Sequence, residues 1–135
     1  MESLFRDSTA IEELTKVNFD KKGKKVSWLN DNYPDSAGFI FVYATWCETC
    51  HQMSSWYETL GRYWENEFHL GSVNSMDIAN KNDELTASWK IEGYPAFYFV
   101  DSKGNVSPMK VKLNKDYIYE AMLDKLDSVR SCRGD

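Results

Sequence analysis

The stretch that decides the fold is Phe39-Ile40-Phe41-Val42-Tyr43-Ala44-Thr45-Trp46-Cys47-Glu48-Thr49-Cys50-His51. It begins as a continuous apolar run rich in aromatic and β-branched residues, which is typical of a strand buried on both faces of a sheet. The run ends in two cysteines two residues apart, and helix-like sequence follows. Such a pair fits a dithiol/disulfide couple, half of a metal site or, because a histidine follows directly, a c-type haem attachment motif.

The bulk composition indicates one globular domain. The chain has 135 residues, of which 42% are hydrophobic and 27% are charged, and these values are ordinary for a single compact core. No run approaches the roughly 18 apolar residues of a membrane span, and residues 1–10 lack the basic start and apolar block of a signal peptide. We expect a soluble chain that could belong to a larger or membrane-anchored protein.

Charge and cysteine count exclude several classes of function. The formal charge of −5 argues against nucleic acid as a partner, because phosphate binding needs a clustered positive surface. The one basic cluster, residues 21–25, is interpreted as a solvated loop. Three cysteines are too few for a disulfide-stapled scaffold, and a zinc site would need two more ligands, for which His69 and Cys132 are not suitably spaced. We expect neither metal nor cofactor.

Strand-like and helix-like patterns alternate along the chain. The hydrophobic pattern and turn residues predict strands at 10–14, 38–44, 69–77, 96–100 and 106–113, with a hairpin turn at 101–105. The apolar island Val26, Trp28 and Leu29 is assigned to a short helix packed against the sheet. Asn82 or Asp83 is expected to cap another short helix that continues to residue 89.

Two longer amphipathic helices are predicted from apolar residues that recur three and four positions apart. The first begins at the cysteines, and its core-facing residues are Met53, Trp56, Tyr57, Leu60, Tyr63 and Trp64. The second is capped by Asn114, and its core-facing residues are Tyr117, Ile118, Ala121, Met122, Leu126 and Val129.

This order of elements predicts a three-layer α/β/α sandwich with a mixed central sheet, because the strand–helix alternation ends in an antiparallel hairpin. The domain is expected to span residues 10–130. Residues 1–9 would form an N-terminal extension, and residues 131–135 a flexible C-terminal tail.

The chain resembles thioredoxin-fold domains, and more closely a catalytic domain of the protein disulfide isomerase type. Residues 41–50 parallel that family's Tyr-Ala-x-Trp-Cys-x-x-Cys, residues 93–96 parallel its Gly-Tyr-Pro-Thr, and residues 15–20 parallel its Thr-x-x-Asn-Phe-Asp. The resemblance covers roughly residues 11–129. It implies a thioredoxin fold and a thiol-disulfide oxidoreductase that acts on cysteine-containing protein substrates and exchanges electrons with an unidentified reductase or oxidase.

The expected chemistry assigns a role to each cysteine. A thiolate at a helix N-terminus is favoured by the helix dipole and by free backbone N–H groups, so Cys47 is the expected nucleophile. Cys50, one turn later, would resolve the mixed disulfide. The resemblance further implies a cis Tyr94-Pro95 bond against Cys47, with the backbone of Tyr94 free to pair with an extended substrate. Trp46 is expected in the surrounding apolar rim, in the core, or in both.

Three departures from the family pattern concern the tuning of this site. Phe41 stands six residues before Cys47, where the family has a buried acid, so deprotonation of Cys50 is expected to be slow. The family's lysine after the second cysteine is replaced by His51, and its helix-kinking proline by Ser55, which predicts a straighter helix.

The residues between and after the cysteines are expected to set the redox poise. Glu48 should oppose the Cys47 thiolate, where the family has a helpful histidine within its motif, and Thr49 is the other tuning residue. His51 either compensates as an imidazolium beside the sulfurs or is a surface residue. We predict a more reducing couple than that of protein disulfide isomerase; a potential near or above the family's would contradict this.

Alternatives of other classes remain. One is a redox-inert binding or chaperone module that holds unfolded segments on the surface around Trp46 and Tyr94, and another is a c-type haem protein; a membrane-tethered thioredoxin of bacterial type is a further alternative. An oxidising secretory or extracytoplasmic compartment is expected, with the endoplasmic reticulum lumen favoured and the cytoplasm as the alternative. The sequence does not assign a role to Cys132.

Overall fold

The computed structural model describes residues 3–31, 33 and 35–132. Its five strands are β1 (Glu12–Leu14), β2 (Gly38–Tyr43), β3 (His69–Asn74), β4 (Ala96–Val100) and β5 (Val106–Met109). Its helices are the 3₁₀ turn η1 (Lys16–Asn18), α1 (Glu48–Tyr63), α2 (Asn82–Ser88) and α3 (Lys115–Cys132). Strands β1, β3 and β5 are shorter than the sequence predicted, and β2 ends one residue earlier than predicted.

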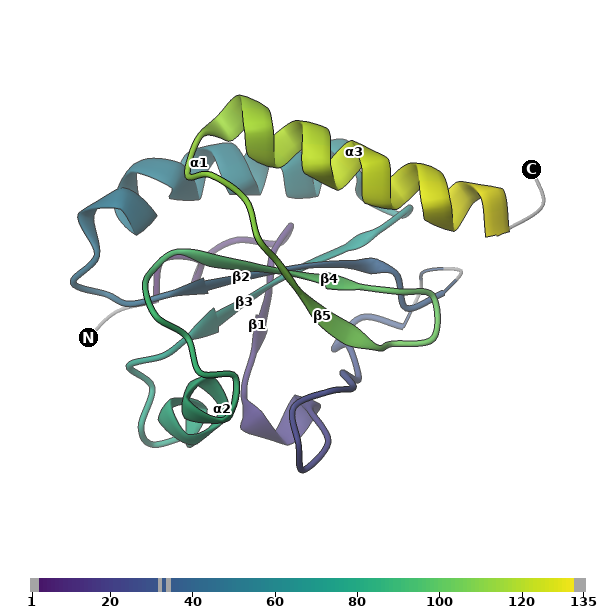
Figure 1. Cartoon of the computed structure of the whole chain (residues 1–135). Coiled ribbons are helices and arrows are strands. Elements are labelled where there is room, and N and C mark those ends of the chain that lie inside the picture. Colours follow the sequence, from purple (N-terminus) through teal and green to yellow (C-terminus); the bar gives the residue numbers. More distant parts are fainter. Residues whose placement is uncertain (1–2, 32, 34, 133–135) are drawn as a thin grey trace.

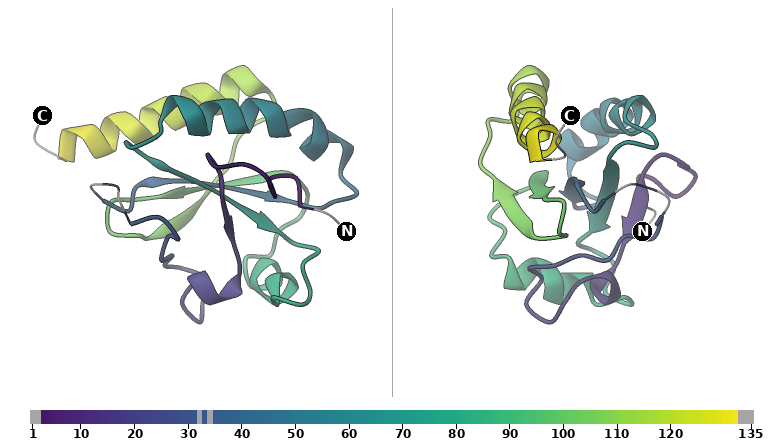
Figure 2. Two further views of the ribbon diagram at one scale, coloured as in Figure 1. Left: turned by 180° about the vertical axis from the view of Figure 1, so that it is seen from behind. Right: turned by 90° about the vertical axis from the view of Figure 1, so that its right-hand side faces the viewer.

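The strands form one mixed sheet in the order β1-β3-β2-β4-β5. Strands β1 and β2 pair in parallel with β3, whereas β4 is antiparallel to β2 and to β5. Helices α1 and α3 cover one face of the sheet, and α2 and η1 lie on the other (Figures 1 and 2). The predicted three-layer sandwich with a mixed sheet is confirmed. Within the described ranges, no helix is long and apolar enough to cross a membrane.

The central position of β2 in the sheet explains why its sequence is continuously apolar. All six of its residues are buried, and successive side chains point to opposite faces. Phe39, Phe41 and Tyr43 join the core beneath α1 and α3. Ile40 and Val42 join the second core, on the side of α2. Because β2 packs against a core on each face, neither of its faces is polar. The site at the end of β2 is therefore attached to a fully buried strand.

The predicted core-facing stripes of the two long helices are mostly correct. Buried positions are Met53, Tyr57, Leu60 and Trp64 at α1, and Ile118, Met122, Leu126 and Val129 on α3. Tyr63 and Tyr117 are exceptions, with 71% and 54% of their surface exposed. Tyr63 is the last residue of α1 and lies beside the stripe. Tyr117 lies in the first turn of α3, where the Lys112 ammonium stands 5.3 Å from its ring centroid.

The short helix predicted at the apolar island near Trp28 is wrong. This segment is extended: Val26 bridges to Phe19, and its N–H donates to the Gly104 carbonyl at 3.0 Å. The Trp28 indole N–H donates to the Ser36 carbonyl at 2.7 Å. Non-local hydrogen bonds thus fasten the apolar side chains against the sheet without helical backbone.

The cap of α2 also differs from the prediction. Lys81, in the left-handed region at φ 60°, is the N-cap residue. Asn82 is instead the first helical residue, and its buried amide donates to the Asn74 carbonyl at 3.0 Å and accepts from the Lys16 N–H at 3.0 Å. The asparagine therefore ties α2 to the ends of β1 and β3. By contrast, Asn114 caps α3 as predicted, because its side-chain oxygen accepts from the Asp116 N–H at 2.9 Å.

Both chain ends carry structure outside the predicted domain of residues 10–130. The N-terminal segment is packed on the domain, because Phe5 has only 2% of its surface exposed and its ring meets Phe41 edge to face at 5.6 Å. At the other end, α3 continues to Cys132, two residues into the predicted tail. The Arg130 guanidinium anchors this last turn to Glu67 Oε1 at 2.7 Å. Residues 133–135 lie outside the described residues.

Candidate active site

The two cysteines stand where β2 passes into α1. After β2 ends, residues 44–46 turn, and the turn is closed by a hydrogen bond from Cys47 N–H to the Ala44 carbonyl at 3.0 Å. Cys47 is the N-cap of α1, with extended backbone, and its sulfur accepts a hydrogen bond from Cys50 N–H at 3.2 Å. A sulfur that accepts a backbone N–H at the positive end of a helix is a favourable place for a thiolate. The structure thus confirms the predicted position of Cys47 at the helix N-terminus.

Cys50 has a very different environment. Both cysteines are free thiols, but Cys50 is completely buried in the core, whereas 6% of Cys47 is exposed. Burial, followed by the hydrogen bond with Cys47, raises the pKa of the Cys50 thiol to about 12. Phe41 of β2 stands at the position where the family has a buried acid. It is fully buried and packs against the rings of Tyr57 and Phe97. The sequence-based expectation that Cys50 is difficult to deprotonate agrees with this arrangement.

The raised pKa of Cys50 predicts a strong pH dependence for any step that needs its thiolate. Below a pKa of about 12, the thiolate fraction grows about tenfold for each pH unit. With Ellman's reagent, attack by Cys47 releases one thionitrobenzoate, and the following attack by Cys50 releases a second. The second release should therefore accelerate by close to this factor per unit on the alkaline side of neutrality. A plateau near neutral pH would contradict the prediction. In a Cys132→Ser background, which removes the third cysteine, Cys50→Ser should release only the first equivalent.

The loop before β4 faces the first cysteine. The Tyr94-Pro95 bond is cis, as the resemblance implied. The Tyr94 carbonyl lies 3.6 Å from Cys47 Sγ, within reach of a hydrogen bond from the thiol. The rings of Trp46 and Tyr94 meet edge to face at 5.8 Å. Trp46 is 64% exposed, so it belongs to the rim and not to the core.

A groove extends from this loop along the neighbouring strands. Its volume is about 600 Å³, and it runs from Trp89 past Tyr94 and Pro95 to Lys110 and Leu113. Tyr94 lines this groove, and its carbonyl also contacts Cys47 Sγ, although neither cysteine lines the groove.

The remaining predicted tuning residues lie in the first turn of α1. Glu48 and Thr49 are exposed between the cysteines, and the effect of Glu48 on the thiolate stays a prediction. His51 is also exposed, but its Nε2 lies 2.7 Å from the Thr45 carbonyl. The ring therefore contacts the backbone of the preceding turn. Ser55 lies within an uninterrupted α1. Among the residues that the structure describes, no group of three or more histidine, cysteine, aspartate or glutamate side chains is arranged to hold a metal ion.

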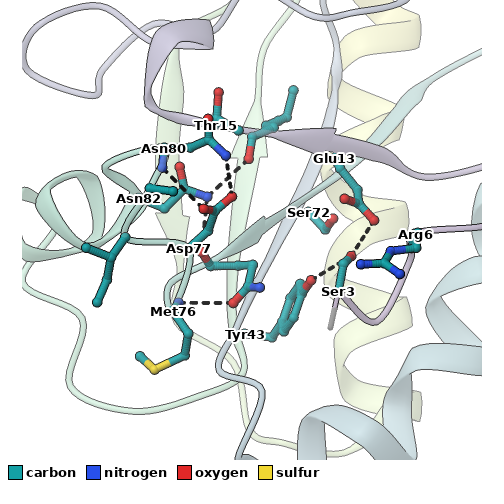
Figure 3. Close-up of a pocket in the computed structure, with 14 residues that line it drawn as sticks. Ser3, Arg6, Glu13, Thr15, Tyr43, Ser72, Met76, Asp77, Asn80 and Asn82 are labelled. Atoms are coloured by element: carbon teal, nitrogen blue, oxygen red, sulfur yellow. Dashed lines mark hydrogen bonds between the residues drawn. The ribbon is translucent and has the colours of Figure 1, made fainter. Parts of the chain in front are cut away.

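Sequence reasoning missed a polar network on the other side of β2. A pocket of about 500 Å³ lies at the carboxyl ends of β1 and β3, and the Tyr43 side chain points toward Ser3 within it (Figure 3). The Tyr43 hydroxyl donates to Ser3 Oγ at 3.0 Å and accepts from Leu4 N–H at 3.1 Å, while Ser3 donates to Glu13. The available sequence signal was the apolar pair Leu4-Phe5, which an extension exposed to solvent would not require.

Comparison with known proteins places this geometry in context. A family model described as Thioredoxin matches residues 10–124. Protein disulfide-isomerase A4 of Mus musculus is 34% identical over 77 residues, which are 57% of this chain and 12% of that relative. The protein of the same name from Homo sapiens is 32% identical over the same length. The match thus spans only about an eighth of these relatives.

Solved structures share the fold at low sequence identity. Thioredoxin f from spinach chloroplast, in its short form, has a TM-score of 0.65 at 18% identity, and the alignment covers 93% of this chain and 98% of that one. The first thioredoxin domain of mouse protein disulfide-isomerase A4 has a TM-score of 0.58 at 16% identity, with 93% and 77% covered. Because the family model extends from before β1 into α3, this chain belongs to the thioredoxin family.

Proposed function

We propose that the protein is a thiol-disulfide oxidoreductase that acts on protein disulfides through Cys47 and Cys50, and that it reduces or isomerises disulfides more than it forms them. The observation that carries this proposal is the position of Cys47 Sγ. It accepts the Cys50 N–H at 3.2 Å at the start of α1 and lies 3.6 Å from the carbonyl of the cis Tyr94-Pro95 loop. The first sulfur thus lies at the helix N-terminus beside the cis-proline loop, and the second is held one turn away.

The reaction would proceed through two exchanges that balance in atoms and electrons. The Cys47 thiolate attacks one sulfur of the substrate disulfide, so that a mixed disulfide forms and the other substrate sulfur leaves as a thiolate. Cys50 then loses its proton to the solvent and attacks Cys47 Sγ, which releases the second substrate thiolate and leaves a Cys47–Cys50 disulfide. The substrate has gained two electrons, and an external dithiol of a reductase would return them to the protein.

The substrate would bind as an extended segment beside the cis-proline loop. Gly93 precedes Tyr94, and nothing lies within 4 Å of the point where a Cβ would stand, so the backbone can be approached closely there. The groove of about 600 Å³ continues from this point to Lys110 and Leu113. Backbone pairing supplies affinity for many sequences, as an enzyme with cysteine-containing protein substrates requires.

Two features support the reducing or isomerising direction. Glu48, the first residue of α1, places a negative charge beside Cys47, and this charge disfavours the thiolate of the reduced form. The pKa of Cys50, raised to about 12 by burial, also favours a protonated resolving thiol. A slow resolving step prolongs the mixed disulfide, during which substrate sulfurs can rearrange.

The compartment follows from the relatives by analogy. Because relatives named protein disulfide-isomerase align with this chain, we place its work in an oxidising secretory or extracytoplasmic compartment, with the endoplasmic reticulum lumen favoured over the cytoplasm. Its partner there would be a reductase or oxidase, and this domain would belong to a larger or membrane-anchored chain.

The same geometry bears on two alternative functions, haem attachment and redox-inert binding. Haem attachment would use both cysteines and His51, but Cys50 lies wholly inside the core and His51 Nε2 is engaged by the Thr45 carbonyl, which favours a resolving thiol. A redox-inert binding module would use the exposed Trp46 surface and would not need an activated Cys47 sulfur.

Reduction of insulin disulfides tests the proposal. With dithiothreitol as electron donor, the wild-type protein should accelerate insulin precipitation, and Cys47→Ser should return the rate to that of dithiothreitol alone, because the attacking sulfur is lost. Replacement of Cys132 with serine is the matched control and should leave the acceleration in place. Equal rates with wild type and Cys47→Ser would favour the redox-inert module.

A further inference from the structure

The His51 ring contacts the main chain of the turn that precedes α1. It is the fourth residue of α1, and its backbone N–H donates to the Cys47 carbonyl at 3.2 Å in the ordinary helical manner. Its ring, however, reaches back beyond the start of the helix, where Nε2 lies 2.7 Å from the Thr45 carbonyl. A carbonyl oxygen only accepts hydrogen bonds, so Nε2 carries the proton in this contact.

The Thr45 carbonyl belongs to the turn that presents the reactive groups. Trp46 and Cys47 follow directly, and the turn is otherwise closed by the Cys47 N–H bond to the Ala44 carbonyl at 3.0 Å. The Tyr43 carbonyl before it already accepts from Ser75 N–H and Ser75 Oγ, both at 2.9 Å. The hydrogen bond from the His51 ring to the Thr45 carbonyl therefore links α1 to the middle of the turn, and it is called the clasp below.

We propose that His51 is a positioning residue for the dithiol, and that its Nε2–H bond to the Thr45 carbonyl holds the turn that presents Trp46 and Cys47 to the substrate. This inference rests on the proposed oxidoreductase function and deepens it. Disulfide exchange needs the attacking sulfur aligned with the bond it breaks, and small displacements of a reacting atom lower the rate of such steps. The clasp fixes Cys47 Sγ relative to the Tyr94 carbonyl, which stands 3.6 Å away.

A positioning role and an electrostatic role for His51 predict different pH behaviour. An imidazolium that stabilised the Cys47 thiolate by its charge would act only on the acidic side of the imidazole titration. The Nε2–H donor is present in both the neutral ring and the imidazolium, since the second proton is added at Nδ1. The contribution of the clasp should therefore persist above about pH 8, beyond the range in which histidine changes charge, whereas a contribution from charge would be lost there.

Two variants separate the donor from the charge. His51→Ala removes both, whereas His51→Gln keeps an amide N–H at a similar reach but cannot become a cation. The assay is made in a Cys132→Ser background, so that the third cysteine does not react. It measures the rate constant for the first thionitrobenzoate release from Ellman's reagent, which then reports attack by Cys47 and needs no protein substrate. His51→Ala should lower it about 2- to 12-fold, the factor that one net hydrogen bond supplies. His51→Gln should recover most of the loss.

The matched control is Gln52→Ala, an exposed change at the next position of the same helix, which should react like wild type. The ratio of the wild-type rate to the His51→Ala rate should stay above one at alkaline pH, where the imidazole is neutral. The proposal is overturned if His51→Gln is as slow as His51→Ala, or if the ratio falls to one at alkaline pH. Failure of the oxidoreductase function is seen separately, as wild-type protein that does not accelerate insulin reduction while its thiols still react with the reagent.

Discussion

Replacement of Cys50 with serine is expected to turn the protein into a trap that remains covalently joined to its substrates. Cys47 keeps its place at the start of α1, where it accepts a hydrogen bond from the backbone N–H of residue 50 at 3.2 Å, and this donor is independent of the side chain. Attack on a substrate disulfide can therefore proceed. The second exchange cannot, because the serine hydroxyl is not a nucleophile toward a disulfide, and the mixed disulfide should persist.

Non-reducing electrophoresis of the protein after incubation with native extract measures the expected effect. Cys50→Ser should give high-mass adducts that disappear on reduction, while wild type should give few. The experiment is best made in a Cys132→Ser background, so that the third cysteine contributes no adduct. The double variant Cys47→Ser/Cys50→Ser is the control, and adducts of similar amount in that variant would show that capture does not depend on the proposed nucleophile.

Local sequence patterns predicted most of the fold because they report which faces of each element are buried. Strand β2 was recognisable because a strand between two cores has no polar position, and all six of its residues are indeed buried. The helix start at Cys47 was likewise predictable, since the period of the apolar residues changes there. The cis Tyr94-Pro95 bond came from resemblance, because an isolated proline carries no local signal for the cis isomer.

The features that sequence reasoning missed depend on individual hydrogen bonds that local sequence patterns do not report. The bond between His51 Nε2 and the Thr45 carbonyl joins a side chain to a main-chain atom, and no sequence pattern reports carbonyl positions. Asn82 is a residue type that often caps helices, but here its side chain donates to the main-chain carbonyls at the ends of β1 and β3. The extended segment around Val26 is likewise fixed by the Gly104 carbonyl. In each case a particular hydrogen-bond partner, and not the local sequence pattern, decided between locally similar options.

Phe5→Ala is expected to destabilise the fold by about 3–5 kcal/mol, the usual cost of removing a buried phenylalanine ring. The ring is 2% exposed and meets Phe41, Tyr43 and Tyr57 with centroids 5.6, 5.8 and 5.9 Å away. Denaturation in urea should show a lower midpoint with little change in slope, because the surface exposed on unfolding is nearly the same. Val17→Ala is the matched control, since Val17 is 88% exposed and should change stability by less than about 0.5 kcal/mol.

The packing of Phe5 against Phe41 also explains why an apolar residue at position 41 suits this chain. Phe41 contacts Phe5 from the N-terminal segment on one side and Tyr57 of α1 on another, so a carboxylate here would stand unpaired among aromatic rings at a large desolvation cost. The N-terminal segment and the apolar position therefore support each other, and the resolving cysteine loses a nearby acid as a consequence. If Phe5→Ala cost no more than Val17→Ala, the segment would not be part of the core, and this explanation of Phe41 would fail.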